Sequence, residues 1–269
     1  SCTDLKSGRK GQGKTLRNWL NIQYNQYEKT GQISFPIPWQ AICQEMLDRQ
    51  RSVTSNFLLH DDEDAKRDRE QIYVPLALVE RRKPDKKQSE HSPETGSKLY
   101  EPQYEEKQRF EHDAFLQQIL EKGESKTNGK RIALIGEPGA GKTTTLQDIA
   151  FWVLEKDLGL PIWISLADLR RNGNLIDLQT YLFDNWLNLA VLPSQKESAK
   201  QELETQIQQG RVWLLLDGVD EVATSGLQIL QHLSQQLIGW LAQSRVLLTC
   251  RLNVWQADLN FLSDFETYR

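Results

Sequence analysis

Two stretches of the chain carry the residue types of a phosphate-binding loop. They read "GRKGQGKT" from Gly8 and "GEPGAGKT" from Gly136, and both fit the pattern G-x-x-x-x-G-K-[ST]. In such a loop the backbone N–H groups bind phosphate oxygens, the lysine neutralises phosphate charge, and the hydroxyl group binds Mg²⁺. Because a chain of this size seldom holds two nucleotide sites, we expect at most one of the two loops to be real.

The residues around each loop decide between them, since a phosphate loop needs a buried strand before it and a helix after it. The apolar run "RIALI" precedes Gly136 and the helical pattern "KTTTLQDIAFWVLEK" follows, whereas the polar stretch "SCTDLKS" precedes Gly8. We therefore predict that Lys142 lies at the phosphates and Thr143 at Mg²⁺, and that the first match is a terminal segment in which Lys14 is a solvated charge. The residues predicted to bind the nucleotide are Gly136, Glu137, Pro138, Gly139, Ala140, Gly141, Lys142, Thr143 and Thr144.

A group of acidic residues supplies the second half of the predicted site. In "RVWLLLDGVDEV" an apolar run ends in Asp217, and Asp220 and Glu221 follow within one loop. At the carboxyl end of a strand, Asp217 would reach the Mg²⁺ shell, and Asp220 or Glu221 would orient or deprotonate an attacking water. Acidic residues also favour helix N-termini, so the position of this loop after a well-formed phosphate loop is what favours function.

A third apolar run, in "SRVLLTCRLNVW", ends in polar residues as well. Thr249 and Arg251 stand there at positions from which a side chain could sense the γ-phosphate. An arginine after a strand is often simply exposed, so its position alone carries less weight than the loop or the acidic group.

These residues must be positioned by a scaffold, and the second half of the chain predicts one. Short apolar runs at 131–135, 161–166, 212–217 and 246–250 alternate with helical patterns at 141–156, 175–189, 195–209 and 226–243. This alternation is typical of βαβ units, in which a parallel sheet is covered by helices on both faces.

The first half of the chain predicts a smaller, mainly helical module. Amphipathic helices are expected in "IPWQAICQEMLDRQRSV" and across residues 105–120, where Phe110, Phe115, Ile119 and Leu120 share a helical spacing. The charge-rich residues 80–98 read as a linker. We therefore expect an N-terminal accessory module at 1–79, a charged linker at 80–98, and a nucleotide-binding domain at 99–269.

Composition narrows the functional classes. The net charge of −4 is too small to predict a nucleic-acid or membrane partner. The three cysteines, Cys2, Cys43 and Cys250, have no disulfide or zinc spacing, and no run of about 18 apolar residues occurs. We expect a cytoplasmic protein with no membrane span.

Taken together, the three motifs resemble the NACHT branch of the signal-transduction (STAND class) P-loop NTPases, most specifically in "LLLDGVDE". The resemblance implies a three-layer α/β/α P-loop fold with ATP or ADP and Mg²⁺ as cofactors. It makes Gly136–Thr144 the Walker A loop, Asp217 the Walker B magnesium residue, and Asp220 and Glu221 the acidic pair needed for hydrolysis. Arg251 becomes the sensor, although "TCRL" stands where the family usually has Thr-Ser-Arg-Pro.

The resemblance also implies an arrangement and partners. The sensor strand should lie between the Walker A and Walker B strands, with nucleotide at their carboxyl ends. Family members usually continue into a helical subdomain and a winged helix, so we expect a bacterial-type domain that is C-terminally incomplete at Arg269. Self-association or a protein effector is the expected kind of partner.

Three functions remain open at this point. The first is an ATP-binding regulatory switch with slow Mg²⁺-dependent hydrolysis, and the second is a nucleotide-binding interaction module that does not turn over. The third is a nucleic-acid-stimulated P-loop ATPase, which near-neutral charge and the lack of a basic, aromatic-interleaved groove disfavour. A GTPase is disfavoured because no N-K-x-D guanine-reading motif occurs.

Overall fold

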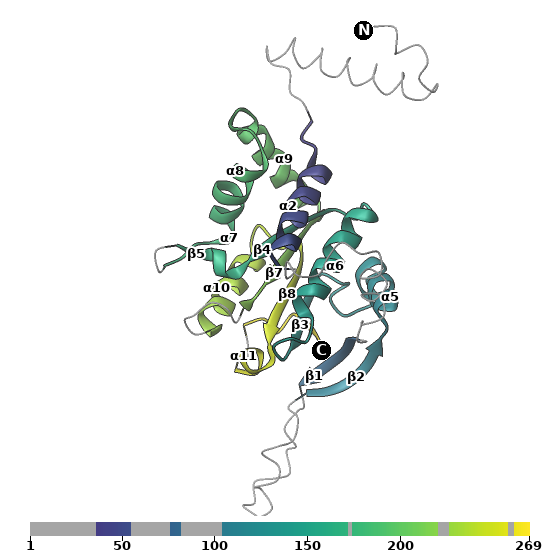
Figure 1. Cartoon of the computed structure of the whole chain (residues 1–269). Coiled ribbons are helices and arrows are strands. Elements are labelled where there is room, and N and C mark those ends of the chain that lie inside the picture. Colours follow the sequence, from purple (N-terminus) through teal and green to yellow (C-terminus); the bar gives the residue numbers. More distant parts are fainter. Residues whose placement is uncertain (1–35, 55–75, 82–103, 172–173, 220–225, 258–260) are drawn as a thin grey trace, which may run out of the picture. The chain divides into compact units, whose positions relative to one another are not determined.

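The computed structural model describes residues 36–54, 76–81, 104–171, 174–219, 226–257 and 261–269 (Figure 1). The chain divides into two compact units, Ser1–Pro38 and Trp39–Arg269, and the second contains the fold discussed below. Among the helices in the described part, none is long and apolar enough to cross a membrane. The loop-like match at Gly8 lies outside the described residues.

A seven-stranded sheet in the order β2-β1-β9-β3-β8-β7-β4 organises this unit (Figure 1). Its strands are β1 Leu76–Arg81, β2 Tyr104–Phe110, β3 Arg131–Gly136, β4 Leu160–Ser165, β7 Val212–Asp217, β8 Arg245–Arg251 and β9 Glu266–Tyr268. The five strands from β9 to β4 are parallel, and β1 and β2 add to the β9 edge in antiparallel register. A separate two-stranded sheet pairs β5 Arg170–Arg171 with β6 Asn174–Leu175.

The parallel core matches the predicted α/β fold. Strand β8 pairs with β3 on one side and with β7 on the other, so the sensor strand lies between the two motif-bearing strands, as expected. Neighbouring residues such as Leu214 and Leu215 point to opposite faces of a strand, and both are fully buried. Both faces of the sheet are therefore covered, which explains why these strands read as continuous apolar runs.

Helices overlap all four predicted patterns of the second half, although the last pattern, 226–243, is helical only to Ile238, and the helices at Leu166–Leu169 and Leu252–Ala257 were not predicted. The helix after the phosphate loop is α6, Lys142–Glu155, which packs on β3, β4, β7 and β8. The others are η3 Leu166–Leu169, α7 Leu178–Thr180, η4 Tyr181–Trp186, α8 Leu187–Ala190, η5 Pro193–Gln195, α9 Lys196–Gln208, α10 Gly226–Ile238 and α11 Leu252–Ala257. Helix α11 contacts β3 and β8.

The helix predicted before the charged region is α2, Trp39–Thr54. It packs on α6 and β4, and its Leu47 belongs to the same apolar core as Leu146 and Ile149 of α6 (Figure 1). The predicted amphipathic face is therefore used to cover the helix that follows the phosphate loop.

The helix predicted across residues 105–120 is wrong for its first half. Residues Tyr104–Phe110 form strand β2, and the helical part begins later, as α5 His112–Ala114 followed by the π-helical η2 Phe115–Glu121. Phe115, Ile119 and Leu120 are buried from the helix as predicted, whereas Phe110 is buried from the strand. Pairing with β1 therefore overrides the helical spacing of the apolar residues in this segment.

Of the predicted linker at 80–98, the structure describes only Glu80 and Arg81, which are the last residues of β1.

Candidate functional site

The phosphate-loop sequence forms the turn between β3 and α6. Strand β3 ends at Gly136 and α6 begins at Lys142, and Glu137 to Gly141 are exposed between them. Gly141, the N-cap of α6, has a φ of 77°, a left-handed conformation that glycine adopts without a Cβ penalty. At Gly136 glycine is favoured by lack of space, because a Cβ there would lie 3.3 Å from the Cβ of Ala140. The sequence thus closes a tight loop whose backbone is open to solvent.

Lys142 folds back over this loop. Its Nζ donates hydrogen bonds to the carbonyl oxygens of Gly136 at 3.1 Å and Glu137 at 2.9 Å. The ammonium group is therefore held at the loop, beside the N-terminus of α6, where unpaired backbone N–H groups and the helix dipole already favour an anion. An exposed loop with one fixed cation at a helix N-terminus is suited to binding phosphate.

Three oxygen-bearing side chains meet next to the loop. Thr143 Oγ1 of α6 donates to Asp217 Oδ1 at the end of β7, with 3.0 Å between the oxygens. Thr249 Oγ1 of β8 donates to the same Oδ1 at 2.6 Å and accepts a hydrogen bond from the Gly218 N–H at 2.8 Å. The phosphate loop, β7 and β8 are therefore joined through one carboxylate oxygen.

The donor set fits a magnesium ion. Mg²⁺ prefers hard oxygen ligands and is usually held by one or two protein oxygens, with water and phosphate completing its shell. Thr143 follows the loop lysine directly, and its hydroxyl lies beside the carboxylate of Asp217. Among the described residues there is no group of three or more His, Cys, Asp and Glu that would form an all-protein cage instead.

Arg251 is the last residue of β8 and pairs in register with Gly136 of β3. It is exposed at the carboxyl edge of the sheet, the edge at which β3, β7 and β8 all end. This is the edge where open α/β sheets bind their ligands. Asp220 and Glu221, which complete the predicted site, lie outside the described residues.

The contact between Thr249 and Asp217 is the feature that sequence reasoning missed. The sequence placed Thr249 at the strand end as a γ-phosphate sensor, whereas its hydroxyl is hydrogen-bonded to Asp217 and Gly218. A threonine inside the apolar run "VLLTC" was the available signal, since a polar side chain in a buried strand needs a partner.

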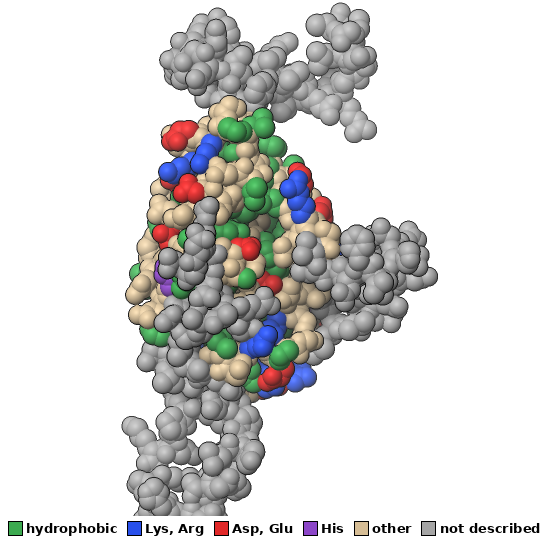
Figure 2. Space-filling model, turned by 60° about the vertical axis from the view of Figure 1, so that its left-hand side comes forward, with side chains coloured by type: hydrophobic (Ala, Val, Ile, Leu, Met, Phe, Trp, Pro, Cys, Tyr) green, Lys and Arg blue, Asp and Glu red, His purple; other side chains and the backbone are tan. Residues whose placement is uncertain are grey.

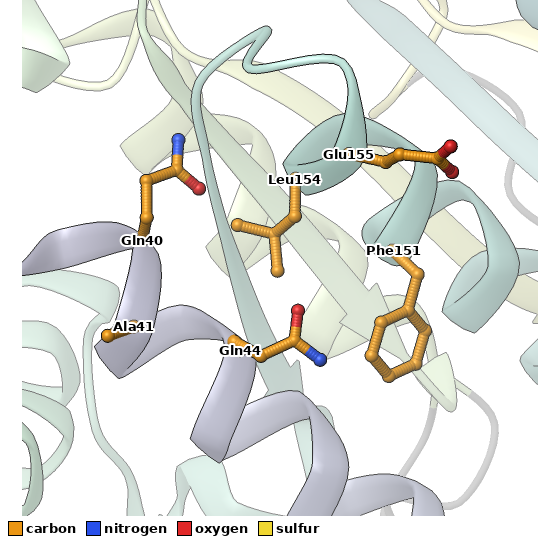
Figure 3. Close-up of a pocket in the computed structure, with 6 residues that line it drawn as sticks. All are labelled: Gln40, Ala41, Gln44, Phe151, Leu154 and Glu155. Atoms are coloured by element: carbon orange, nitrogen blue, oxygen red, sulfur yellow. The ribbon is translucent and has the colours of Figure 1, made fainter. Parts of the chain in front are cut away.

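A groove between α2 and α6 lies elsewhere. It is lined by Gln40, Ala41 and Gln44 of α2 and by Phe151, Leu154 and Glu155 of α6. Leu154 points toward α2 in Figure 3. Phe151 is nine residues beyond Lys142, about 14 Å along a helix, so this groove is separate from the phosphate loop.

Comparison with known proteins places the chain in a family. A family model described as the NACHT domain matches residues 130–268, which is just over half of the chain and includes the loop, Asp217 and Arg251. This chain belongs to the NACHT family. A NACHT domain implies a nucleotide-binding NTPase, in agreement with the geometry at Lys142.

The NACHT chain was also compared with solved structures and with curated proteins. The structure of C. elegans PCH-2 is similar at 16% sequence identity and a TM-score of 0.28. The similarity covers 52% of this chain and 35% of the PCH-2 chain, so the NACHT chain spans about a third of that protein. Among curated proteins, no sequence matches this chain.

Proposed function

We propose that this NACHT protein is an ATP-binding signal-transduction switch that resets by slow, Mg²⁺-dependent hydrolysis. The observation that carries the proposal is the convergence of Lys142, Thr143 and Asp217 at one edge of the sheet. A nucleotide at this edge would contact the strands that carry both motifs, and its γ-phosphate could change how they are held. Such a difference between triphosphate and diphosphate forms is what a switch requires.

In this proposal each residue has a separate task. The backbone N–H groups of Glu137 and of Gly139 to Thr144 bind the phosphates, and Lys142 neutralises charge at the β- and γ-oxygens. Thr143 and Asp217 hold Mg²⁺, which when bound screens phosphate charge and helps to orient the triphosphate. Asp220 and Glu221 orient and deprotonate the attacking water, and Arg251 senses the γ-phosphate.

One feature favours a switch over a nucleic-acid motor, and another favours ATP over GTP. The described side chains on the face drawn in Figure 2 include Lys, Arg, Asp and Glu interspersed, without a continuous basic stripe. Binding of nucleic acid depends on clustered positive charge along the backbone path. The absence of an N-K-x-D sequence also favours adenine over guanine as the base.

Phosphate release from ATP tests this function. The protein should release phosphate slowly with ATP and Mg²⁺, and chelation of Mg²⁺ should stop the release. Lys142→Ala should lose nucleotide binding and turnover together, because it removes the cation at the loop. Tight ATP binding without any phosphate release would instead establish the non-hydrolysing interaction module, and stimulation by DNA or RNA would favour the motor.

A further inference from the structure

Thr249 is a buried hydroxyl in an apolar strand. It follows Val246, Leu247 and Leu248 in β8, is 2% exposed, and pairs in register with Leu134 of β3. In such a place valine would fill the same space and suit the strand equally well. A hydroxyl group is retained in a buried strand at a cost in desolvation unless both its hydrogen and a lone pair find partners.

Both partners belong to the end of β7. The hydroxyl hydrogen goes to Asp217 Oδ1 at 2.6 Å, and the hydroxyl oxygen accepts the N–H of Gly218 at 2.8 Å. Gly218 is buried and has a φ of 79°, so it turns the chain sharply as it leaves the strand. One side chain of β8 therefore fixes the direction of the Asp217 carboxylate and the start of the acidic loop at once.

From this geometry we infer that Thr249 is a positioning residue for the magnesium site. It acts through Asp217: it holds the carboxylate so that Mg²⁺ meets it in a single orientation, and it holds Gly218 so that the following loop leaves β7 in one direction. Because its hydrogen is given to Asp217, Thr249 does not donate to the γ-phosphate while this bond is made. The inference rests on the proposed Mg²⁺-dependent binding of ATP.

Thr143 and Thr249 donate to the same carboxylate oxygen but lie on different elements of the fold. Thr143 is in α6, directly after the loop lysine, and is itself a predicted Mg²⁺ ligand. Thr249 is in the middle strand between β3 and β7, and Arg251 follows it two residues later. The strand that carries the predicted sensor, Arg251, therefore also carries the hydroxyl that is hydrogen-bonded to Asp217.

The test uses two substitutions of Thr249 to separate the effect of its hydroxyl group from the effect of its side-chain volume. A substitution at a second buried threonine is the control. Thr249→Val keeps the shape and removes both hydrogen bonds, whereas Thr249→Ser keeps the hydroxyl. Thr267→Val is the matched control, because Thr267 is also buried, pairs with the middle of β3, and is in β9, on the side of β3 away from β8. If Thr249→Val fails to fold, Thr249→Ala removes the hydroxyl without placing a methyl group against the carboxylate.

The readout is the Mg²⁺ concentration needed for tight binding of the β,γ-imido analogue of ATP, measured by titration calorimetry, with thermal unfolding as a check of folding. We expect Thr249→Val to raise that Mg²⁺ requirement roughly ten-fold or more, the effect of losing a hydrogen bond to a charged group. Affinity for the analogue without Mg²⁺ should change by no more than about two- to three-fold, because Asp217 acts on the nucleotide through the metal ion. Thr249→Ser should restore the parent requirement, and Thr267→Val should leave it unchanged.

Three results would overturn the inference, and they differ from one another. If Thr249→Val has the parent requirement while Lys142→Ala loses binding, the nucleotide site stands and the role of Thr249 falls. If Thr249→Ser is as impaired as Thr249→Val, the side chain serves packing. If the parent protein does not bind the analogue with Mg²⁺ at all, the proposed function fails and the inference fails with it.

Discussion

The hydroxyl of Thr143 donates to Asp217 Oδ1 across 3.0 Å, joining two residues that are 74 positions apart in the chain. The bond links the first turn of α6 to the end of β7 and brings the two halves of the predicted site together. A magnesium site made from these residues would therefore need little rearrangement of the backbone. Pre-organisation of this kind reduces the entropic cost of ligand binding.

Removal of the loop lysine should separate the two phosphate-loop sequences. Lys142→Ala removes a charge-assisted contact of about 1.5 to 3 kcal/mol, so ATP affinity should fall by about 10- to 150-fold. Lys14→Ala, which changes the corresponding lysine of the first match, should have no measurable effect. Titration calorimetry with ATP measures both variants, and equal losses would contradict the choice of the Gly136 loop.

The acidic residues should divide into metal binding and turnover. Asp217→Asn removes the charged Mg²⁺ ligand and should weaken ATP binding only when Mg²⁺ is present. Glu221→Gln keeps the shape and hydrogen-bonding capacity but removes the base, so it should retain ATP and lose phosphate release. Parent-like turnover in both Glu221→Gln and Asp220→Asn would show that the loop after Gly218 does not act in hydrolysis.

Tyr268 of β9 should matter for its ring and not for its hydroxyl. The ring is fully buried, 4.9 Å from Phe115 and 6.2 Å from Phe110 between centroids. Its OH has no hydrogen-bond partner among the described residues. Tyr268→Ala should therefore lower the free energy of unfolding by about 3 to 5 kcal/mol. Tyr268→Phe should be neutral or stabilising in urea unfolding, and a loss as large as that of the alanine variant would reveal a missing partner for the hydroxyl.

Glu266 should make stability depend on pH. Burial alone would raise its pKa, but hydrogen bonds from the hydroxyls of Ser125 and Thr127 and from the N–H groups of Lys126 and Thr127 hold the pKa below its ordinary value of 4.5. Because the folded pKa is lowered, the carboxylate stabilises the fold above pH 4.5, and this stability is lost as the pH falls through the folded pKa.

The matched variant is Glu266→Gln. At pH 7 it should be less stable than the parent by about 1.5 to 3 kcal/mol, the cost of losing hydrogen bonds to a charged group. Urea unfolding at pH 7 and at successively lower pH should show this difference shrinking below pH 4.5. A difference that stays constant with pH would mean that Glu266 is not ionised in the folded protein.

Four strands of the parallel core, β3, β4, β7 and β8, could be predicted because they are both apolar and buried on both faces. In β3 every residue is buried, so "RIALIG" reads as an apolar run without any knowledge of its neighbours. In contrast, β2 exposes Glu105 to Arg109 and buries Phe110, so its sequence has no strand periodicity. Its structure comes from pairing with β1, which a local pattern does not contain.

The short strand β9 was missed for a related reason. Its residues Glu266, Thr267 and Tyr268 are buried although the first two are polar, because β3 and β1 enclose the strand from both sides. At the candidate site, the loop and Asp217 could be predicted from the sequence, because the residue types and their spacing are enough to indicate phosphate and magnesium binding. The role of Thr249 depended on which strands are neighbours, and that information lies in the sheet order.

The order of strands also determines when the site can form. Strand β3, which carries the phosphate loop, has as its partners β8 at Arg245–Arg251 and β9 at Glu266–Tyr268, both more than a hundred residues later. On the ribosome, β3 emerges long before either partner, and such distant pairings slow folding. A chain still in synthesis therefore has the loop sequence without the loop geometry. Nucleotide binding would therefore require the complete sheet. Because ATP would bind only the folded state, it would stabilise that sheet.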